Sequence, residues 1–148
     1  MHFSSGINRP PYEAKDGFLQ VTSGCTHGTC KFCNFYKDSK FKFSPMEEIE
    51  ADIKELRDSG WQFDRIYLQG ADPLIRSYED LVKIAEMIHK YLPEVETIGG
   101  YARVDNLKNK TVEQLKICMS LVIVIFILEW RAATINFWRE WIKAISLK

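Results

Sequence analysis

Short apolar runs of β-type character recur along the first two thirds of the chain. They lie at 17–24, 64–70 and 95–100, and each ends in glycine or another small residue. Runs of this length that are bounded by turn residues are typical of strands. The pattern therefore predicts three strands.

Each predicted strand is followed by apolar residues at helical spacing, which predicts three helices. The first is expected to begin at an N-cap at Ser44, which a proline follows, and to end at Gly60. The second runs from a cap at Ser77 to Pro93, and the third begins at Thr111 with a glutamine three residues later.

Strand and helix alternating three times predicts an α/β fold around a parallel sheet. In such sheets, ligands bind beyond the carboxyl ends of the strands. The segments that follow the three strands are the cysteine-rich loop 23–36, QGADP (69–73) and GGYARVDN (99–106). We expect these three loops to share one face and one site.

The composition fits one globular domain. Of 148 residues, 46% are hydrophobic and 27% are charged, so the chain can bury a core. Its 20 Lys and Arg balance 20 Asp and Glu, which argues against a protein that binds nucleic acid over its whole surface. The lysine- and aromatic-rich stretch 36–43 is interpreted as a solvated loop.

The N-terminal sequence MHFSSGINRPPYEA lacks the basic start and apolar run of a secretion signal. We therefore expect a cytoplasmic protein, in which clustered cysteines indicate metal or redox chemistry instead of disulfides. The apolar run 121–128 is shorter than the roughly 20 residues of a membrane-spanning helix. We interpret it as a buried element and expect no membrane segment.

The cysteine loop carries three thiols in the spacing Cys-x4-Cys-x2-Cys: Cys25, Cys30 and Cys33. Thiolates are soft ligands that select iron–sulfur clusters or zinc. Three thiolates could hold a [4Fe–4S] cluster and leave its fourth iron open. Alternatively, the same cysteines with His27 could close a small Cys3His zinc-binding module without catalysis. Three metal-free thiols are the remaining interpretation.

Several motifs resemble those of radical S-adenosylmethionine (radical SAM) enzymes. CTHGTCKFC after LQVTSG resembles their cluster loop, with one residue more than the commonest Cys-x3-Cys-x2-Cys spacing. QGADP resembles their Gly-Gly-Glu-Pro-like motif, with Asp in place of Glu and Ala in place of Gly. RPPYEA (9–14) and GGYARVDNL (99–107) resemble a subgroup of the family. The resemblance covers roughly residues 8–116.

The resemblance implies a partial TIM-like (β/α) barrel of about three βα units at 17–116, after an N-terminal strap at 1–16. It assigns Cys25, Cys30 and Cys33 as the ligands of a [4Fe–4S] cluster. The residues that it places at S-adenosyl-L-methionine are Phe32, Gly70, Ala71 and Asp72.

The implied chemistry is reductive cleavage of S-adenosylmethionine to methionine and a 5′-deoxyadenosyl radical, which abstracts hydrogen from a substrate. The cluster supplies the electron, so the resemblance also implies an electron donor such as flavodoxin or ferredoxin. The substrate, a small molecule or a macromolecule, is not indicated by these residues.

The last part of the chain, 117–148, is an atypical hydrophobic tail. It has no glycine, proline or aspartate, and it carries Trp130, Trp138 and Trp141. Strand–helix units normally have such turn residues between them, so the tail does not resemble a fourth unit.

We hypothesise that the reading frame shifts near Lys116. Back-translation of 117–141 with permitted codons, read two bases further on, allows LHEFGYRDFYFGVESGDDQFLERM. Its FGVESGDD resembles the fourth strand and loop of radical SAM enzymes. In this case Cys118 is not a native cluster ligand, and the shortened barrel is expected to be impaired in turnover.

Overall fold

The computed structural model describes residues 1–121 and 123–128. Its strands are β1 (Gly17–Gln20), β2 (Thr22–Ser23), β3 (Lys42–Phe43), β4 (Arg65–Gln69), β5 (Thr97–Ala102) and β6 (Ile123–Leu128). Its α-helices are α1 (Met46–Asp58), α2 (Tyr78–Tyr91), α3 (Val104–Leu107) and α4 (Val112–Ser120), and its 3-10 turns are η1 (Pro11–Glu13) and η2 (Pro73–Ile75).

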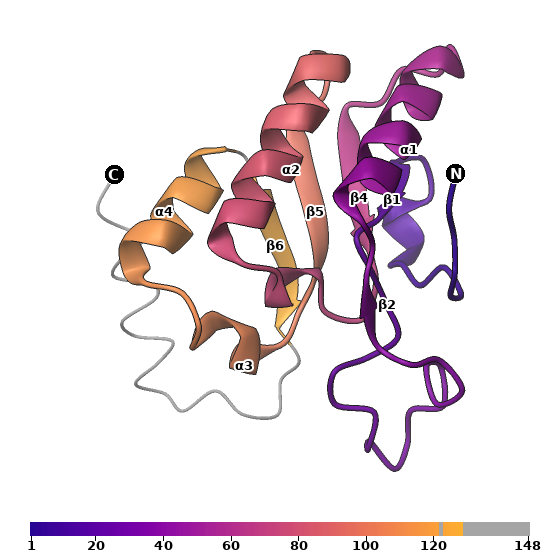
Figure 1. The fold of residues 1–148 in the computed structure, drawn as a ribbon, viewed down its shortest axis with the longest axis vertical. Helices are drawn as coiled ribbons and strands as arrows, with labels where there is room; N and C mark the ends of the chain where they lie inside the picture. The colour runs from indigo at the N-terminus through magenta and orange to yellow at the C-terminus, as the bar shows by residue number, and fades with distance from the viewer. Residues whose placement is uncertain (122, 129–148) are drawn as a thin grey trace.

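A four-stranded parallel sheet in the order β1-β4-β5-β6 forms the centre of the fold (Figure 1). The predicted α/β class and the three predicted strands are confirmed. β6 adds a fourth parallel strand within the segment that sequence analysis assigned to the tail. Over the described residues the sheet is open, with β1 and β6 at its edges. It is consistent with part of a barrel.

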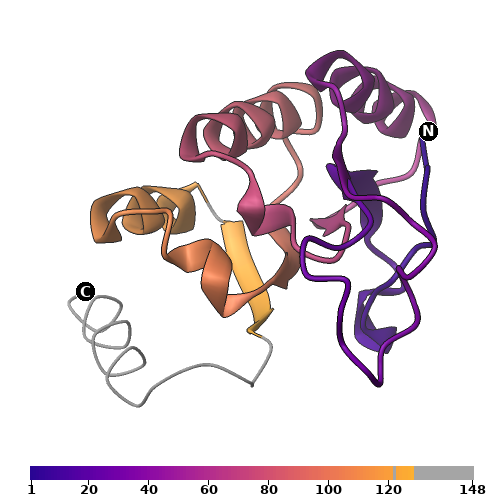
Figure 2. The ribbon, with the colours of Figure 1, turned by 60° about the horizontal axis from the view of Figure 1, so that its bottom comes forward.

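Helices cover one face of this sheet. Figure 2 shows α1, α2 and α4 on one side of the strands and η1 on the other. Side chains alternate along a strand, so Leu19, Ile66 and Leu68 point toward the helices and join the apolar core. Ile53 and Ile84 pack into this core from the helices.

The opposite face, which we call the inner face, is polar and aromatic. By the same alternation it carries Phe18, Gln20, Arg65, Tyr67 and Gln69. Both glutamines and Tyr67 are buried. Something must therefore cover these side chains, and the N-terminal strap does so.

Two of the three predicted N-caps are confirmed. The Ser77 hydroxyl accepts from the Asp80 amide at 3.1 Å, and Thr111 forms a capping box with Gln114. The predicted cap at Ser44 is wrong, because α1 begins at Met46. The Ser44 amide instead donates to the carbonyl of Val21 at 3.1 Å, which keeps this residue beside β2.

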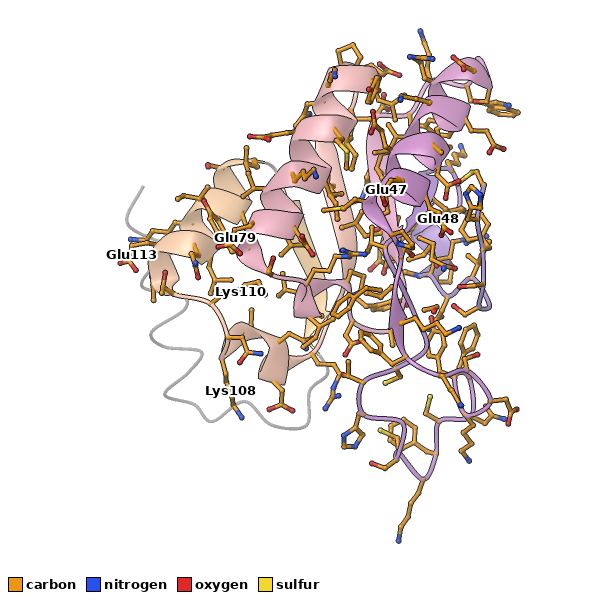
Figure 3. The ribbon with its side chains drawn as sticks, viewed as in Figure 1. Glu47, Glu48, Glu79, Lys108, Lys110 and Glu113 are labelled. Atoms are coloured by element: carbon orange, nitrogen blue, oxygen red, sulfur yellow. The ribbon has the colours of Figure 1, made fainter. Side chains whose placement is uncertain are left out.

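The starts of the helices are acidic, as the helix dipole favours. Glu47 and Glu48 lie in the first turn of α1, Glu79 in that of α2 and Glu113 in that of α4 (Figure 3). Near them, the Lys110 ammonium donates to two carbonyls at η2, those of Leu74 (2.6 Å) and Arg76 (2.8 Å). Burial lowers the pKa of Lys110.

Among the described residues, every helix is too short or too polar to cross a bilayer.

Candidate functional site

The cysteine loop is closed at its base by a short antiparallel ladder. Thr22 pairs with Phe43 and Ser23 pairs with Lys42. The two ends of the loop 24–41 are therefore held side by side. Gly24 has φ of +69°, and a Cβ there would lie 2.8 Å from the Lys40 backbone. Only glycine fits such an approach without strain, so the sequence fixes the base of the loop although the loop has little regular structure.

A cavity of about 210 Å³ lies beside this loop. Its lining comes from the cysteine loop, from Ala71 after β4, from the end of β5 at Tyr101 and Ala102, and from Asn8 of the strap. The expectation that the three informative loops share one face is confirmed. The cavity lies at the carboxyl ends of the parallel strands, the usual place for a ligand in such sheets.

All three loop cysteines line this cavity and are half-buried with free thiols. Within the described part of the chain, no three His, Cys, Asp or Glu side chains converge closely enough to hold a metal ion. The thiols thus share a cavity without being gathered around one point. Their softness fits an iron–sulfur cluster, and they would have to converge to bind one.

His27 also lines the cavity, and its Nε2 lies 3.0 Å from the Thr29 hydroxyl. The imidazole therefore has a partner within its own loop. It is near the cysteines, as the zinc interpretation requires.

The charge of the cavity is positive. Lys37 and Arg103 are among its lining residues, and no Asp or Glu is. These cations favour a ligand that carries negative charge, and Lys37 is the stronger contributor because Arg103 also pairs with Asp105 at 3.2 Å. A cluster held by thiolates and the carboxylate of an amino acid both have this property.

Asp72 connects the QGADP loop to the cysteine loop. It is 0% exposed and accepts a hydrogen bond from the Thr26 hydroxyl. Arg103 donates to the same hydroxyl at 3.0 Å and pairs with Asp105 at 3.2 Å. Burial raises the pKa of Asp72, while Thr26 and Arg103 oppose that shift. Asp72 is thus not a lining residue of the cavity. Its hydrogen bond holds Thr26, the residue after Cys25, in place.

The other predicted cofactor contacts are spread around the cavity. Ala71 lines it. Gly70 has φ of +127°, and a Cβ there would lie 2.0 Å from Thr22 Oγ1, so this glycine brings the end of β4 against the start of the cysteine loop. Phe32 is 63% exposed and is not among the lining residues.

Sequence reasoning did not single out Asn8, Tyr36 or Lys37 as cavity residues. Asn8 directly precedes the RPPYEA motif, which was the available signal. Tyr36 is buried. Its burial is the main cause of its raised pKa, and the nearby Tyr101 raises the pKa further. Lys37 lies in a stretch that composition alone marks as a solvated loop.

The fold and the site together define an α/β protein with a cysteine loop at the carboxyl edge of a parallel sheet. A family model of the radical SAM superfamily matches residues 19–121, which include the cysteine loop, β4, β5 and α4. The chain therefore belongs to the radical SAM superfamily. A search of curated proteins finds no match.

Proposed function

We propose that this chain binds a [4Fe–4S] cluster through Cys25, Cys30 and Cys33 and binds S-adenosylmethionine next to it. The observation that carries the proposal is that all three thiols line one cavity inside the segment that matches the family. Three thiolates leave one iron of such a cluster without a protein ligand. That iron is where S-adenosylmethionine would bind.

When bound, these cofactors supply reductive cleavage of S-adenosylmethionine and hydrogen abstraction from a substrate. The chain's own part is to bind, orient and shield. Lys37 and Arg103 favour the negative charges of the ligands, and Tyr101 and Phe35 exclude water from the apolar part of the cavity. The electron donor, such as a flavodoxin or ferredoxin, and a cytoplasmic location belong to the same proposal.

Four residues are proposed to support S-adenosylmethionine. Ala71 is in the cavity and would contact it directly. Gly70 and Asp72 would set the backbone on either side of Ala71, through the close approach to Thr22 and the hydrogen bond from Thr26. Phe32 would approach the adenine once the cysteines converge.

Anaerobic reconstitution with iron and sulfide tests the cluster. We expect about four iron atoms per chain and a broad absorption band at about 400 nm from thiolate-to-iron charge transfer. Replacing any loop cysteine by serine should abolish both signals. Cys118→Ser is the matched control and should retain them, because Cys118 is buried in the helix-side core.

The zinc module makes the opposite prediction. It would give stoichiometric zinc without the absorption band, and His27→Ala would release the metal. For a cluster held by cysteines alone, His27→Ala should leave the iron content unchanged. Stoichiometric zinc together with a lack of iron uptake would overturn the proposed function.

We also propose that the chain is impaired in turnover because its reading frame shifts near Lys116. The unusual composition of 117–148 supports this. Most of that segment, 122 and 129–148, lies outside the described residues, while Ile123–Leu128 forms β6. Reading the gene tests the idea: a single-base change should restore a frame that encodes FGVESGDD. If none does, or if this chain generates 5′-deoxyadenosine with sustained turnover, the idea fails.

A further inference from the structure

From Ser4 to Glu13 the N-terminal strap crosses the inner face of the sheet, whereas Met1 and His2 bond to Glu55 and Asp52 of α1. Near the carboxyl ends of the strands, the Gln20 amide pairs twice with Ser4, through the Ser4 amide (2.9 Å) and the Ser4 hydroxyl (2.8 Å). At the opposite end, the Glu13 carboxylate pairs with Arg65 at 2.8 Å. The strap therefore runs antiparallel to β1 and β4.

Two more contacts attach the strap to the strands. The Asn8 amide donates to Gln69 Oε1 at 3.2 Å, and the Arg9 guanidinium lies 5.5 Å from the centre of the Phe18 ring. Gln20 and Gln69 are register partners on β1 and β4, and they are 4% and 2% exposed. Two buried amides side by side thus bind the backbone of one passing segment.

This attachment has a consequence for the site. Asn8 is the strap residue that lines the cysteine cavity. Its backbone is fixed by Gln69, and within the described residues its side-chain amide has no protein partner among the hydrogen bonds. An asparagine amide both donates and accepts, so it suits a ligand such as S-adenosylmethionine, which carries groups of both kinds.

We propose that Gln20 and Gln69 are positioning residues that hold the strap over the inner face so that Asn8 forms part of the S-adenosylmethionine site. The inference rests on the proposed function. It adds a wall that comes from outside the segment matched by the family model, which begins at residue 19. The strap is then part of the site.

The first test measures the strap without any cofactor. Gln69→Leu removes the acceptor for the Asn8 amide with little change in volume, so hydrogen exchange in residues 4–9 should accelerate at least tenfold. Alkylation of the loop cysteines should also become faster, because one wall of their cavity is loosened. Gln62→Leu, at an exposed position, is the matched control and should change neither rate.

The second test measures affinity for S-adenosylmethionine in the reconstituted chain by equilibrium dialysis. Asn8→Ala should leave strap exchange and iron content unchanged but weaken binding about tenfold, the effect of one lost hydrogen bond to a charged ligand. Asn109→Ala, at an exposed position, should bind like wild type. Gln69→Leu should weaken binding at least as much as Asn8→Ala.

Two outcomes separate this inference from the proposed function. If wild type takes up no iron, the proposed function fails. If wild type takes up iron and binds S-adenosylmethionine, but Asn8→Ala and Gln69→Leu bind it equally well, the inference about the strap is overturned and the proposed function stands.

Discussion

The two faces of the parallel sheet come from the same strands but differ in what covers them. Toward the helices, the strands present Leu19, Ile66 and Leu68 to a continuous apolar core. Toward the strap, Gln20 and Gln69 bind a backbone segment. The apolar face contributes stability through burial, whereas the polar face binds through a few directed contacts.

Adjacent residues of β1 give the sharpest test of this contrast. Leu19→Ala should lower the free energy of unfolding by about 2–5 kcal/mol, the usual cost of such a truncation in a core. Phe18→Ala should cost less than Leu19→Ala although it removes the larger side chain, because its ring is only partly buried and lies against Arg9 of the strap. Denaturant unfolding measures both. Equal losses would show that the inner face is a second core.

Gly70→Ala should have the next largest effect. The new methyl group would meet Thr22 Oγ1, and alanine is strained at a φ of +127°. Strain of this kind costs about 1–3 kcal/mol, and its relief should move the cysteine loop away from β4. Unfolding and the alkylation rate of the loop cysteines would report it. A variant with wild-type stability and thiol rates would show that the approach of β4 to the loop is not needed.

The Thr26 hydroxyl should matter somewhat less. Thr26→Val keeps the shape but removes the group that donates to Asp72 and accepts from Arg103. A buried carboxyl that loses a partner costs about 1–3 kcal/mol, and we expect the lower part of that range because Thr26 itself is exposed. Iron uptake should also fall. Thr26→Ser retains the hydroxyl and should behave like wild type; if serine and valine behave alike, the hydroxyl has no such role.

The last effect is a pH dependence and is expected at Asp16, which pairs with Arg65 at 3.3 Å. Burial and the adjacent Glu13 raise its pKa from 3.8 to about 7, against the opposing charge of Arg65. Because the folded chain holds this proton more tightly than the unfolded chain, its contribution to stability is lost as pH rises from about 4 to 7. Asp16→Asn removes that loss. The difference in unfolding midpoint between variant and wild type should grow over this range in favour of the variant, and a constant difference would contradict the assignment.

Apolar runs and helical periodicity were sufficient to predict β1, β4 and β5 and the helices α1, α2 and α4. Residues such as Leu19, Ile53 and Ile84 repeat with the period of their elements, and that repeat reflects one-sided burial. The start of α1 was misplaced because Ser44 is claimed by a tertiary contact with Val21. Local capping preferences do not include such contacts.

The cysteines were found because their spacing alone indicates ligation.

The inner face was much less predictable. The strap lies on the sheet through glutamine amides and backbone groups, which leave no periodic signature. Asp72 resembles a cofactor contact in sequence, yet its burial behind Thr26 depends on how two loops pack. β6 was not anticipated because its segment lacks the turn residues that mark the earlier strands.

The most direct test of the central claim is electron paramagnetic resonance of the reduced, reconstituted chain, recorded with and without S-adenosylmethionine. If Cys25, Cys30 and Cys33 leave one iron open, the cofactor should bind that iron and change the cluster signal. Asn8→Ala should require a higher concentration for the same change. A cluster signal that S-adenosylmethionine leaves unchanged at saturating concentration would contradict the account.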